Sequence, residues 1–126
     1  MKARWMYGSL RLRITPTELQ ALMRGEAISE SLGPAGCWTV SVEPGPGTRF
    51  VAHAERVAVS LSSDDLGRLA QPDSEGVYFT SAETPTVAYF IEKDFPCVHP
   101  RPPETRQLET ETFAPPAGFE KRHRTR

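Results

Sequence analysis

A change in the parity of the apolar residues near the start of the chain constrains the fold more than any other feature. In residues 2–15, KARWMYGSLRLRIT, apolar side chains occupy odd positions up to Tyr7 and even positions from Leu10 onward. A single straight strand would place these two sets on opposite faces of a sheet. A hairpin with Gly8-Ser9 as its two-residue turn places both sets on one face, and Gly followed by Ser suits a type II′ turn. A β-bulge at the same two residues is the alternative.

The rest of the pattern predicts an α+β domain. The residues from Thr15 to Glu18 form a capping-box signature before a short helix over residues 16–24, and residues 62–70 predict a second helix. Six more strands are predicted, over residues 27–32, 37–42, 49–54, 56–61, 77–82 and 86–92. The order ββ-α-ββββ-α-ββ with short turns predicts a mainly antiparallel sheet, with the two short helices covering one face. No internal repeat is visible in the sequence.

Proline marks a boundary between a folded body and an irregular C-terminal arm. Seven of the 12 prolines lie in the last 42 residues, and regular patterning fades after Phe95. We therefore expect one α+β domain over residues 1–100 and a proline-rich arm with a basic end over residues 101–126.

The net charge and the cysteine content limit the cellular compartment and the class of protein that we expect. The net charge is −1, with basic stretches at both ends of an acidic middle. Two cysteines are too few for a disulfide scaffold, and no apolar run approaches the length of a membrane span. The N-terminus does not resemble a signal peptide. We therefore expect a cytoplasmic protein with reduced thiols and no membrane association.

The end of the last predicted strand carries the densest group of charges, in FIEKDFPCVHPRPP over residues 90–103. The parity of Lys93 matches that of the apolar residues before it, so its side chain should point toward the core and form a structural ion pair. Glu92 and Asp94 should share the opposite face. They could neutralise basic groups or, alternatively, act in acid-base chemistry or cation binding.

Cys97 and His99 offer a rival interpretation of the same stretch. Residues two apart in an extended chain point to one side, so the thiolate and the imidazole could share a metal ion. Zinc requires three or four protein ligands, which would have to include residues such as Cys37 or His53. The pair could also be a reactive thiol with its base.

Basic residues gather on the outer face of the predicted N-terminal hairpin. Arg11 and Arg13 point outward, and the predicted register sets Arg4 opposite Arg13, where like charges repel unless an anion or a carboxylate lies between them. Together with the C-terminal KRHRTR, this face could bind nucleic acid. The acidic body of the chain and the lack of exposed aromatic residues among the basic ones disfavour that alternative.

Two motifs carry a resemblance to a known family. Ser9 to Thr15 reads SLRLRIT, and Glu92 to Cys97 reads EKDFPC. With the strand and helix around them, they resemble a small bacterial family of uncharacterised proteins with an S-x-R-L-R-x-T motif near the start and an E-K-D-F-x-C motif near the end. The resemblance covers roughly residues 1–101 and implies a compact bacterial domain, but no activity. Six charged or cysteine residues fall inside the shared motifs, namely Arg11, Arg13, Glu92, Lys93, Asp94 and Cys97.

These observations predict a non-catalytic binding or accessory protein. Arg11, Arg13 and Lys93 would engage a small anionic ligand or an acidic protein partner, and Glu92 and Asp94 would orient them. Sheet edges and the C-terminal arm also offer surfaces for a homo-oligomer. The sequence identifies no cofactor.

Overall fold

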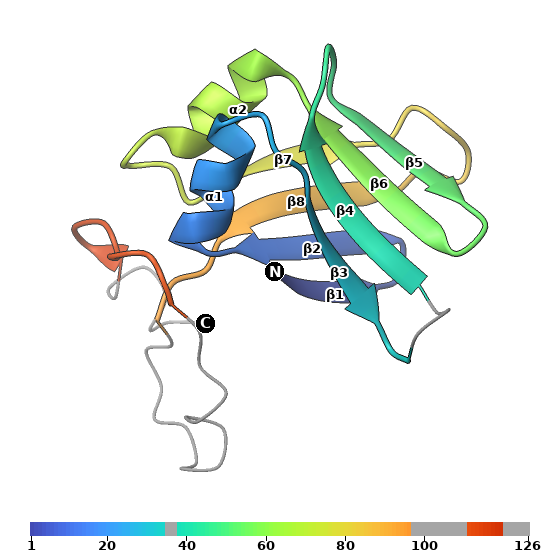
Figure 1. The fold of residues 1–126 in the computed structure, drawn as a ribbon, viewed down its shortest axis with the longest axis horizontal. Helices are drawn as coiled ribbons and strands as arrows, with labels where there is room; N and C mark the ends of the chain where they lie inside the picture. The colour runs from blue at the N-terminus through green and yellow to red at the C-terminus, as the bar shows by residue number, and fades with distance from the viewer. Residues whose placement is uncertain (35–37, 97–110, 120–126) are drawn as a thin grey trace.

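The computed structural model describes residues 1–34, 38–96 and 111–119, and within them the ten predicted elements appear in the predicted order (Figure 1). The strands are β1 (Lys2–Met6), β2 (Ser9–Ile14), β3 (Ile28–Leu32), β4 (Trp38–Pro44), β5 (Arg49–His53), β6 (Arg56–Leu61), β7 (Gly76–Thr80) and β8 (Ala88–Lys93). The helices are α1 (Pro16–Met23) and α2 (Ser63–Ala70). The α+β class and the element order are confirmed.

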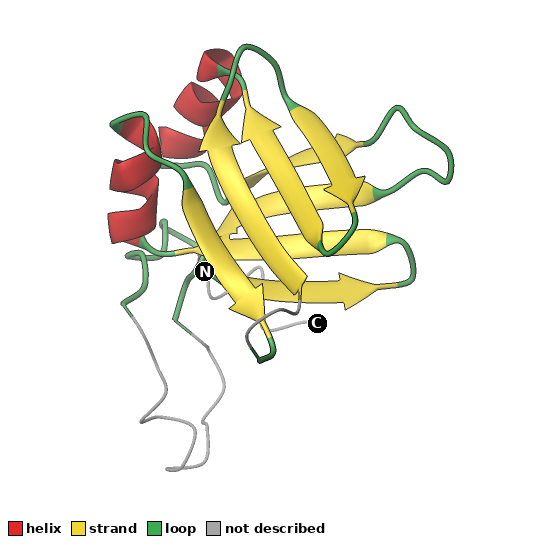
Figure 2. Cartoon of the chain, turned by 45° about the vertical axis from the view of Figure 1, so that its right-hand side comes forward, coloured by secondary structure: helices red, strands yellow, loops and turns green. Residues whose placement is uncertain are grey.

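The strands form two four-stranded sheets that face each other, with both helices gathered at one end (Figure 2). Sheet A has the order β1-β2-β8-β7, and sheet B has the order β3-β4-β6-β5. The central pair of each sheet is parallel, and the outer pairs are antiparallel. We expected one sheet with helices on its face. Two eight-residue helices are too short to cover eight strands, so the apolar faces of the two sheets cover each other instead.

The strand order reveals two similar halves, each built as ββαββ. Each sheet takes one hairpin from each half, because β2 pairs with β8 and β4 pairs with β6. Adding 47 to the number of a residue in β1, β2 or α1 gives its counterpart in β5, β6 or α2, as with Leu12 and Val59. The two parallel ladders agree with this alignment, since Leu12 lies opposite Ile91 and Val59 lies opposite Val42. The repeat is hard to see in the sequence, because inner-face counterparts share apolar character but rarely identity, and outer-face counterparts such as Arg4 and Val51 share neither.

The first hairpin exists, but its turn is Tyr7-Gly8 and not the predicted Gly8-Ser9. Tyr7 and Gly8 have φ values of 47° and 80°, the positive values at both central residues that a type I′ turn requires. The ladder therefore pairs Trp5 with Leu10 and Arg4 with Arg11. The predicted pairing of Arg4 with Arg13 was wrong, although both apolar sets do share one face. The β5–β6 turn likewise begins one residue before the end of the predicted strand 49–54, because it consists of Ala54, with a φ of 52°, and Glu55.

Both helices begin at the capping residues that the sequence predicts. The Thr15 side chain accepts a hydrogen bond from the Glu18 backbone N–H, and the Glu18 carboxylate accepts one from the Thr15 N–H. Ser62 caps α2 in the same way, through the Asp65 N–H. These caps satisfy backbone donors that would otherwise lack partners at the helix ends.

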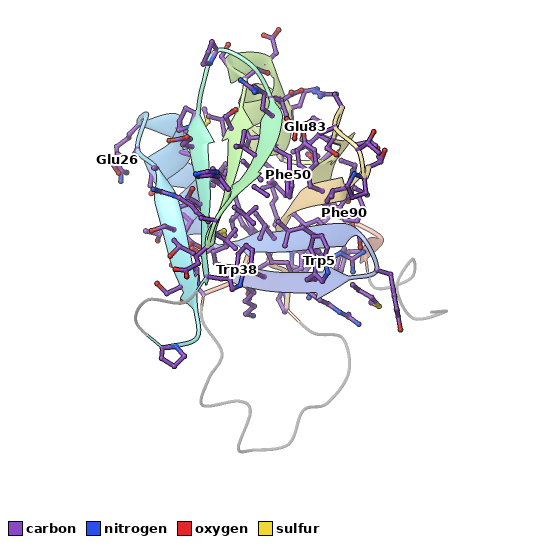
Figure 3. All side chains as sticks on the ribbon, turned by 90° about the vertical axis from the view of Figure 1, so that its right-hand side faces the viewer. Trp5, Glu26, Trp38, Phe50, Glu83 and Phe90 are labelled. Atoms are coloured by element: carbon purple, nitrogen blue, oxygen red, sulfur yellow. The ribbon has the colours of Figure 1, made fainter. Side chains whose placement is uncertain are left out.

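The core lies between the sheets and under the helices. Phe50 of sheet B contacts Tyr89 of sheet A across the interior, with ring centroids 5.5 Å apart. Figure 3 shows Phe50 between the sheets, with Trp5 and Trp38 at the margin, where each is about half exposed. The largest fully buried side chains of the described ranges are Leu12, Ile14, Leu22, Leu61, Leu69, Ile91, Val40, Val42 and Val59.

Residues 111–119 pack against the strand-end region of the domain. The Phe113 N–H donates to the Asp94 carbonyl oxygen at 2.8 Å. The Phe95 ring contacts the rings of Phe113 and Phe119, with centroids 6.1 and 4.7 Å away. The Glu111 carboxylate accepts a hydrogen bond from the Thr17 N–H in the first turn of α1. Hydrogen bonding from the Thr17 side chain, and then from its backbone, lowers the pKa of Glu111. This part of the predicted arm is irregular in structure and docked on the domain.

Candidate functional site

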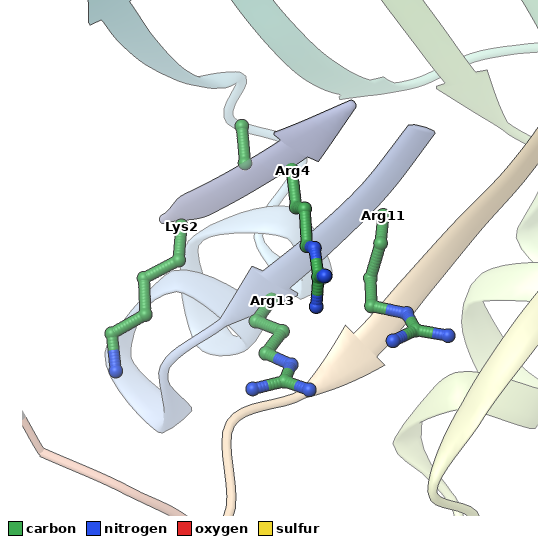
Figure 4. A pocket seen from close by; sticks show the side chains of 5 residues that line it. Lys2, Arg4, Arg11 and Arg13 are labelled. Atoms are coloured by element: carbon green, nitrogen blue, oxygen red, sulfur yellow. The ribbon is translucent and has the colours of Figure 1, made fainter. Parts of the chain in front are cut away.

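Four cations project from the outer face of the β1–β2 hairpin. Side chains alternate across a strand, so residues 2 and 4 of β1 and residues 11 and 13 of β2 point away from the core (Figure 4). We call Lys2, Arg4, Arg11 and Arg13 the basic array. With Ala3, they line an open hollow of about 100 Å³.

Carboxylates neutralise two members of the basic array. Lys2 Nζ lies 2.7 Å from Asp94 Oδ2, and only 3% of Asp94 is exposed. Arg11 Nε lies 2.7 Å from Glu92 Oε1, and these two atoms are shielded from solvent without meeting hydrogen-bond geometry. Both ion pairs hold a basic side chain in place beside the hollow.

The other two members of the basic array are Arg4 and Arg13. No residue in the described part of the chain forms an ion pair with either of them. Arg4 lies opposite Arg11 in the ladder, and Arg13 lies between Lys2 on β1 and Glu92 on β8, whose carboxylate pairs with Arg11. Like charges directly opposite each other destabilise a sheet. Within the described ranges, the array therefore carries more positive charge than the two carboxylates beside it balance.

Aromatic side chains continue the same face of sheet A beyond the array. The Arg11 guanidinium lies 5.7 Å from the centre of the Phe90 ring, and the Phe90 and Tyr78 ring centroids are 5.5 Å apart. The ladder aligns Arg4, Arg11, Phe90 and Tyr78 in one row across the sheet. The Tyr78 side chain is 57% exposed. The outer face of sheet A is thus basic at one edge and aromatic at the other.

Lys93 points to the opposite face from the array. It is 6% exposed, and its ammonium group donates a hydrogen bond to the Gln71 carbonyl oxygen at 2.6 Å. The Phe113 ring centre lies 5.5 Å from Nζ. Burial lowers the pKa of Lys93, and attraction to Asp73 opposes that shift. The prediction that Lys93 points toward the core was therefore correct. Within the described ranges, however, its partner is the Gln71 carbonyl oxygen and not the expected carboxylate.

The structure brings most of the predicted site residues together. Arg11, Arg13 and Glu92 are neighbours on the outer face, and Asp94 joins them through Lys2. The sequence interpretation missed Lys2, which lies beside Arg13 only because of the hairpin register. It also missed the aromatic row, since Tyr78 and Phe90 lie more than 60 residues beyond the basic strands.

The alternative site at Cys97 and His99 lies outside the described residues, as does Cys37. His53 is exposed on β5. The described ranges contain no group of three or more His, Cys, Asp or Glu side chains that could hold a metal ion. They also contain no helix that is long and apolar enough to cross a membrane.

Comparison with known proteins places the chain in a family. The family model DUF7009, a family of unknown function, matches residues 1–116, so the chain belongs to that family. Neither the curated proteins nor the solved structures contain a match. The matched region includes the basic array, both carboxylates and the docked residues 111–116.

Proposed function

We propose that this member of a family of unknown function binds an anionic ligand, or the acidic surface of a protein partner, through the basic array, without catalysing a reaction. The observation that carries the proposal is a pair of guanidinium groups, Arg4 and Arg13, that have no ion-pair partner among the described residues and lie beside an open hollow. Guanidinium groups bind carboxylate and phosphate oxygens with paired hydrogen bonds.

The structural repeat supports this proposal, because sheet B shows which residues the same strand geometry requires when no basic array is present. The counterparts of Arg4, Arg11 and Arg13 in sheet B are Val51, Ala58 and Ser60. The same ladder geometry therefore forms without any cation at these positions. Three arginines on the corresponding strands of sheet A are better explained by a ligand than by the folding of the hairpin.

The two ion-paired cations would preorganise the site. Asp94 restrains Lys2, and Glu92 together with the Phe90 ring restrains Arg11. Less side-chain freedom is then lost when an anion binds. Lys93 is not part of this proposal, because its amine points to the other face.

The test is a titration of purified protein with two anionic probes, a short poly-glutamate peptide and inorganic phosphate, at low salt. We expect the Arg4→Ala/Arg13→Ala double variant to bind the preferred probe at least ten-fold more weakly than the unmodified protein. The control is Arg49→Ala/Arg56→Ala, which removes the same charge from exposed positions of sheet B. Equal binding by the two double variants would overturn the proposal, and so would the absence of binding by the unmodified protein.

A further inference from the structure

We infer that the anion bound by the basic array is a phosphomonoester dianion, carried on a ligand whose flat apolar part lies on Phe90 and Tyr78. This inference rests on the proposed function and deepens it. Three features of the outer face of sheet A support it, namely the charge, the size of the hollow and the aromatic row.

The charge of the face suits a doubly charged group. Its ionised groups in the described ranges are the cations Lys2, Arg4, Arg11 and Arg13 and the carboxylates Glu92 and Asp94. Four positive and two negative charges leave a net charge of +2. A carboxylate ligand supplies one negative charge, whereas a phosphomonoester carries about −1.5 to −2 at neutral pH. The phosphomonoester therefore balances the excess more fully.

The geometry of the hollow suits one small oxyanion. Arg4 and Arg13 are diagonal neighbours on adjacent strands, so their guanidinium groups can approach one anion from two sides. The hollow measures about 100 Å³, which equals roughly three water molecules at about 30 Å³ each. A single phosphate group fits such a space, and the remainder of a larger ligand must lie outside it.

The aromatic row gives that remainder a place to bind. Arg11 lies beside the hollow and over the Phe90 ring, and Phe90 contacts Tyr78 in turn. A ligand phosphate near Arg4 and Arg13 would therefore direct an attached ring across the sheet, along Phe90 toward Tyr78. Aromatic side chains bind flat apolar groups by stacking. Sheet B has Ser41 and Ser29 at the counterpart positions, so it offers no such surface.

Phenyl phosphate, inorganic phosphate and benzoate are the probes, titrated calorimetrically at pH 5.5 and pH 8. A phosphomonoester loses its second proton with a pKa near 6, so phenyl phosphate should bind about four-fold more tightly at pH 8. A carboxylate ligand is ionised at both values, because carboxyl groups ordinarily titrate at lower pH. Benzoate should therefore bind weakly and equally at both pH values.

Variants test which residues bind the phosphate group of the ligand and which bind its ring. Arg4→Ala/Arg13→Ala should abolish binding of both phosphates, whereas Arg4→Lys/Arg13→Lys, which keeps the charge, should weaken it by a smaller factor. Tyr78→Ala should weaken phenyl phosphate binding several-fold and leave inorganic phosphate binding unchanged. The matched control is Ser29→Ala at the counterpart position of sheet B, which should change neither.

The outcomes separate this inference from the proposed function. If benzoate binds as tightly as phenyl phosphate, without pH dependence but still through Arg4 and Arg13, the array binds anions and the phosphomonoester assignment is wrong. An unchanged preference for phenyl phosphate in Tyr78→Ala would overturn the role of the aromatic row. If the poly-glutamate peptide and all three small probes fail to distinguish the unmodified protein from Arg4→Ala/Arg13→Ala, both the assignment and the proposed function fail.

Discussion

The inner and outer faces of the two sheets differ in how closely the repeated halves match. On the inner faces, the counterparts Leu12 and Val59 are both fully buried, and so are Ile91 and Val42. On the outer faces, the counterparts of the arginines of sheet A are small or aliphatic residues, and those of its aromatic row are serines. The fold thus constrains the chemistry of the interior in both halves but leaves the two outer surfaces free to diverge.

The difference between the two outer surfaces includes one arrangement of charges in sheet A that is unfavourable for stability. Arg4 and Arg11 lie directly opposite each other, although sheet B shows that Val51 and Ala58 serve the same ladder. The fold does not require this like-charge pair, which by itself destabilises the sheet; the proposed anion binding would give it a role. The following four changes test this contrast, beginning with the largest expected effect.

Leu12→Ala and Val59→Ala test the equivalence of the two interiors. Leu12→Ala should lower the free energy of unfolding by about 3 kcal/mol through lost burial and a cavity. Val59→Ala should lower it by about 2 kcal/mol, because fewer buried methyl groups are removed. Urea denaturation measures both values. A large loss in one half and none in the other would show that the halves do not share one core.

Lys2→Met and its counterpart Arg49→Met compare the two edge strands. Lys2→Met leaves the buried Asp94 carboxylate without its cation, so we expect a loss of about 1.5 kcal/mol. Arg49 is exposed, and its replacement should change stability by less than about 0.5 kcal/mol. Restoration of stability by the double variant Lys2→Met/Asp94→Asn would confirm the cause. Equal losses in the two single variants would remove the distinction between the edges.

Lys93 and its counterpart Pro44 differ in whether a titratable group is buried at the end of the central strand. Burial lowers the pKa of Lys93, so between that value and the ordinary 10.5 the unfolded chain binds more protons than the folded one. Stability of the unmodified protein should therefore rise with pH as 10.5 is approached from below, relative to Lys93→Met. Denaturation midpoints of both proteins from pH 7 to pH 10.5 measure the difference. A parallel pH dependence would show that the amine is not desolvated.

Arg4→Val, which places the sheet B residue at its sheet A counterpart, should have the smallest effect on stability. Removal of the charge opposite Arg11 should raise the free energy of unfolding by about 0.3 kcal/mol. The gain should disappear in 1 M salt, because exposed charges are then screened. Val51→Ala is the control on sheet B and should show no salt dependence. A clear loss of stability in Arg4→Val would mean that the fold does need this arginine.

Local sequence rules predicted the elements but not their assembly. Capping residues and apolar alternation were enough for both helices and for the first hairpin, since these depend on neighbours in the chain. The β1–β2 and β5–β6 turns lie one residue earlier than the sequence pattern indicates. Tyr7 and Ala54 adopt positive φ values there, although tyrosine and alanine rarely do so. The division into two sheets depends on pairing between distant strands, such as β2 with β8, which local pattern does not encode.

The residues of the candidate site also differ in whether local sequence pattern or strand register reveals them. Arg11, Arg13 and Glu92 were identified because they lie in strand patterns with clear parity. Lys2 and Tyr78 were not, because only the register of sheet A brings them to the same face. Lys93 was placed on the correct side, yet its partner is a backbone carbonyl group that no side-chain pattern could reveal.

The exchange of hairpins between the halves also determines the order in which the protein can assemble during synthesis. The central pair of sheet B joins residues close in sequence, such as Val42 and Val59, whereas the central pair of sheet A joins Leu12 to Ile91. Contacts between distant residues form slowly, because a long loop must close first. Sheet B can therefore form on a growing chain while the β1–β2 hairpin still waits for β8. Until then the edge of β2 that pairs with β8 lacks its partner strand, and unpaired strand edges make a nascent chain prone to aggregation.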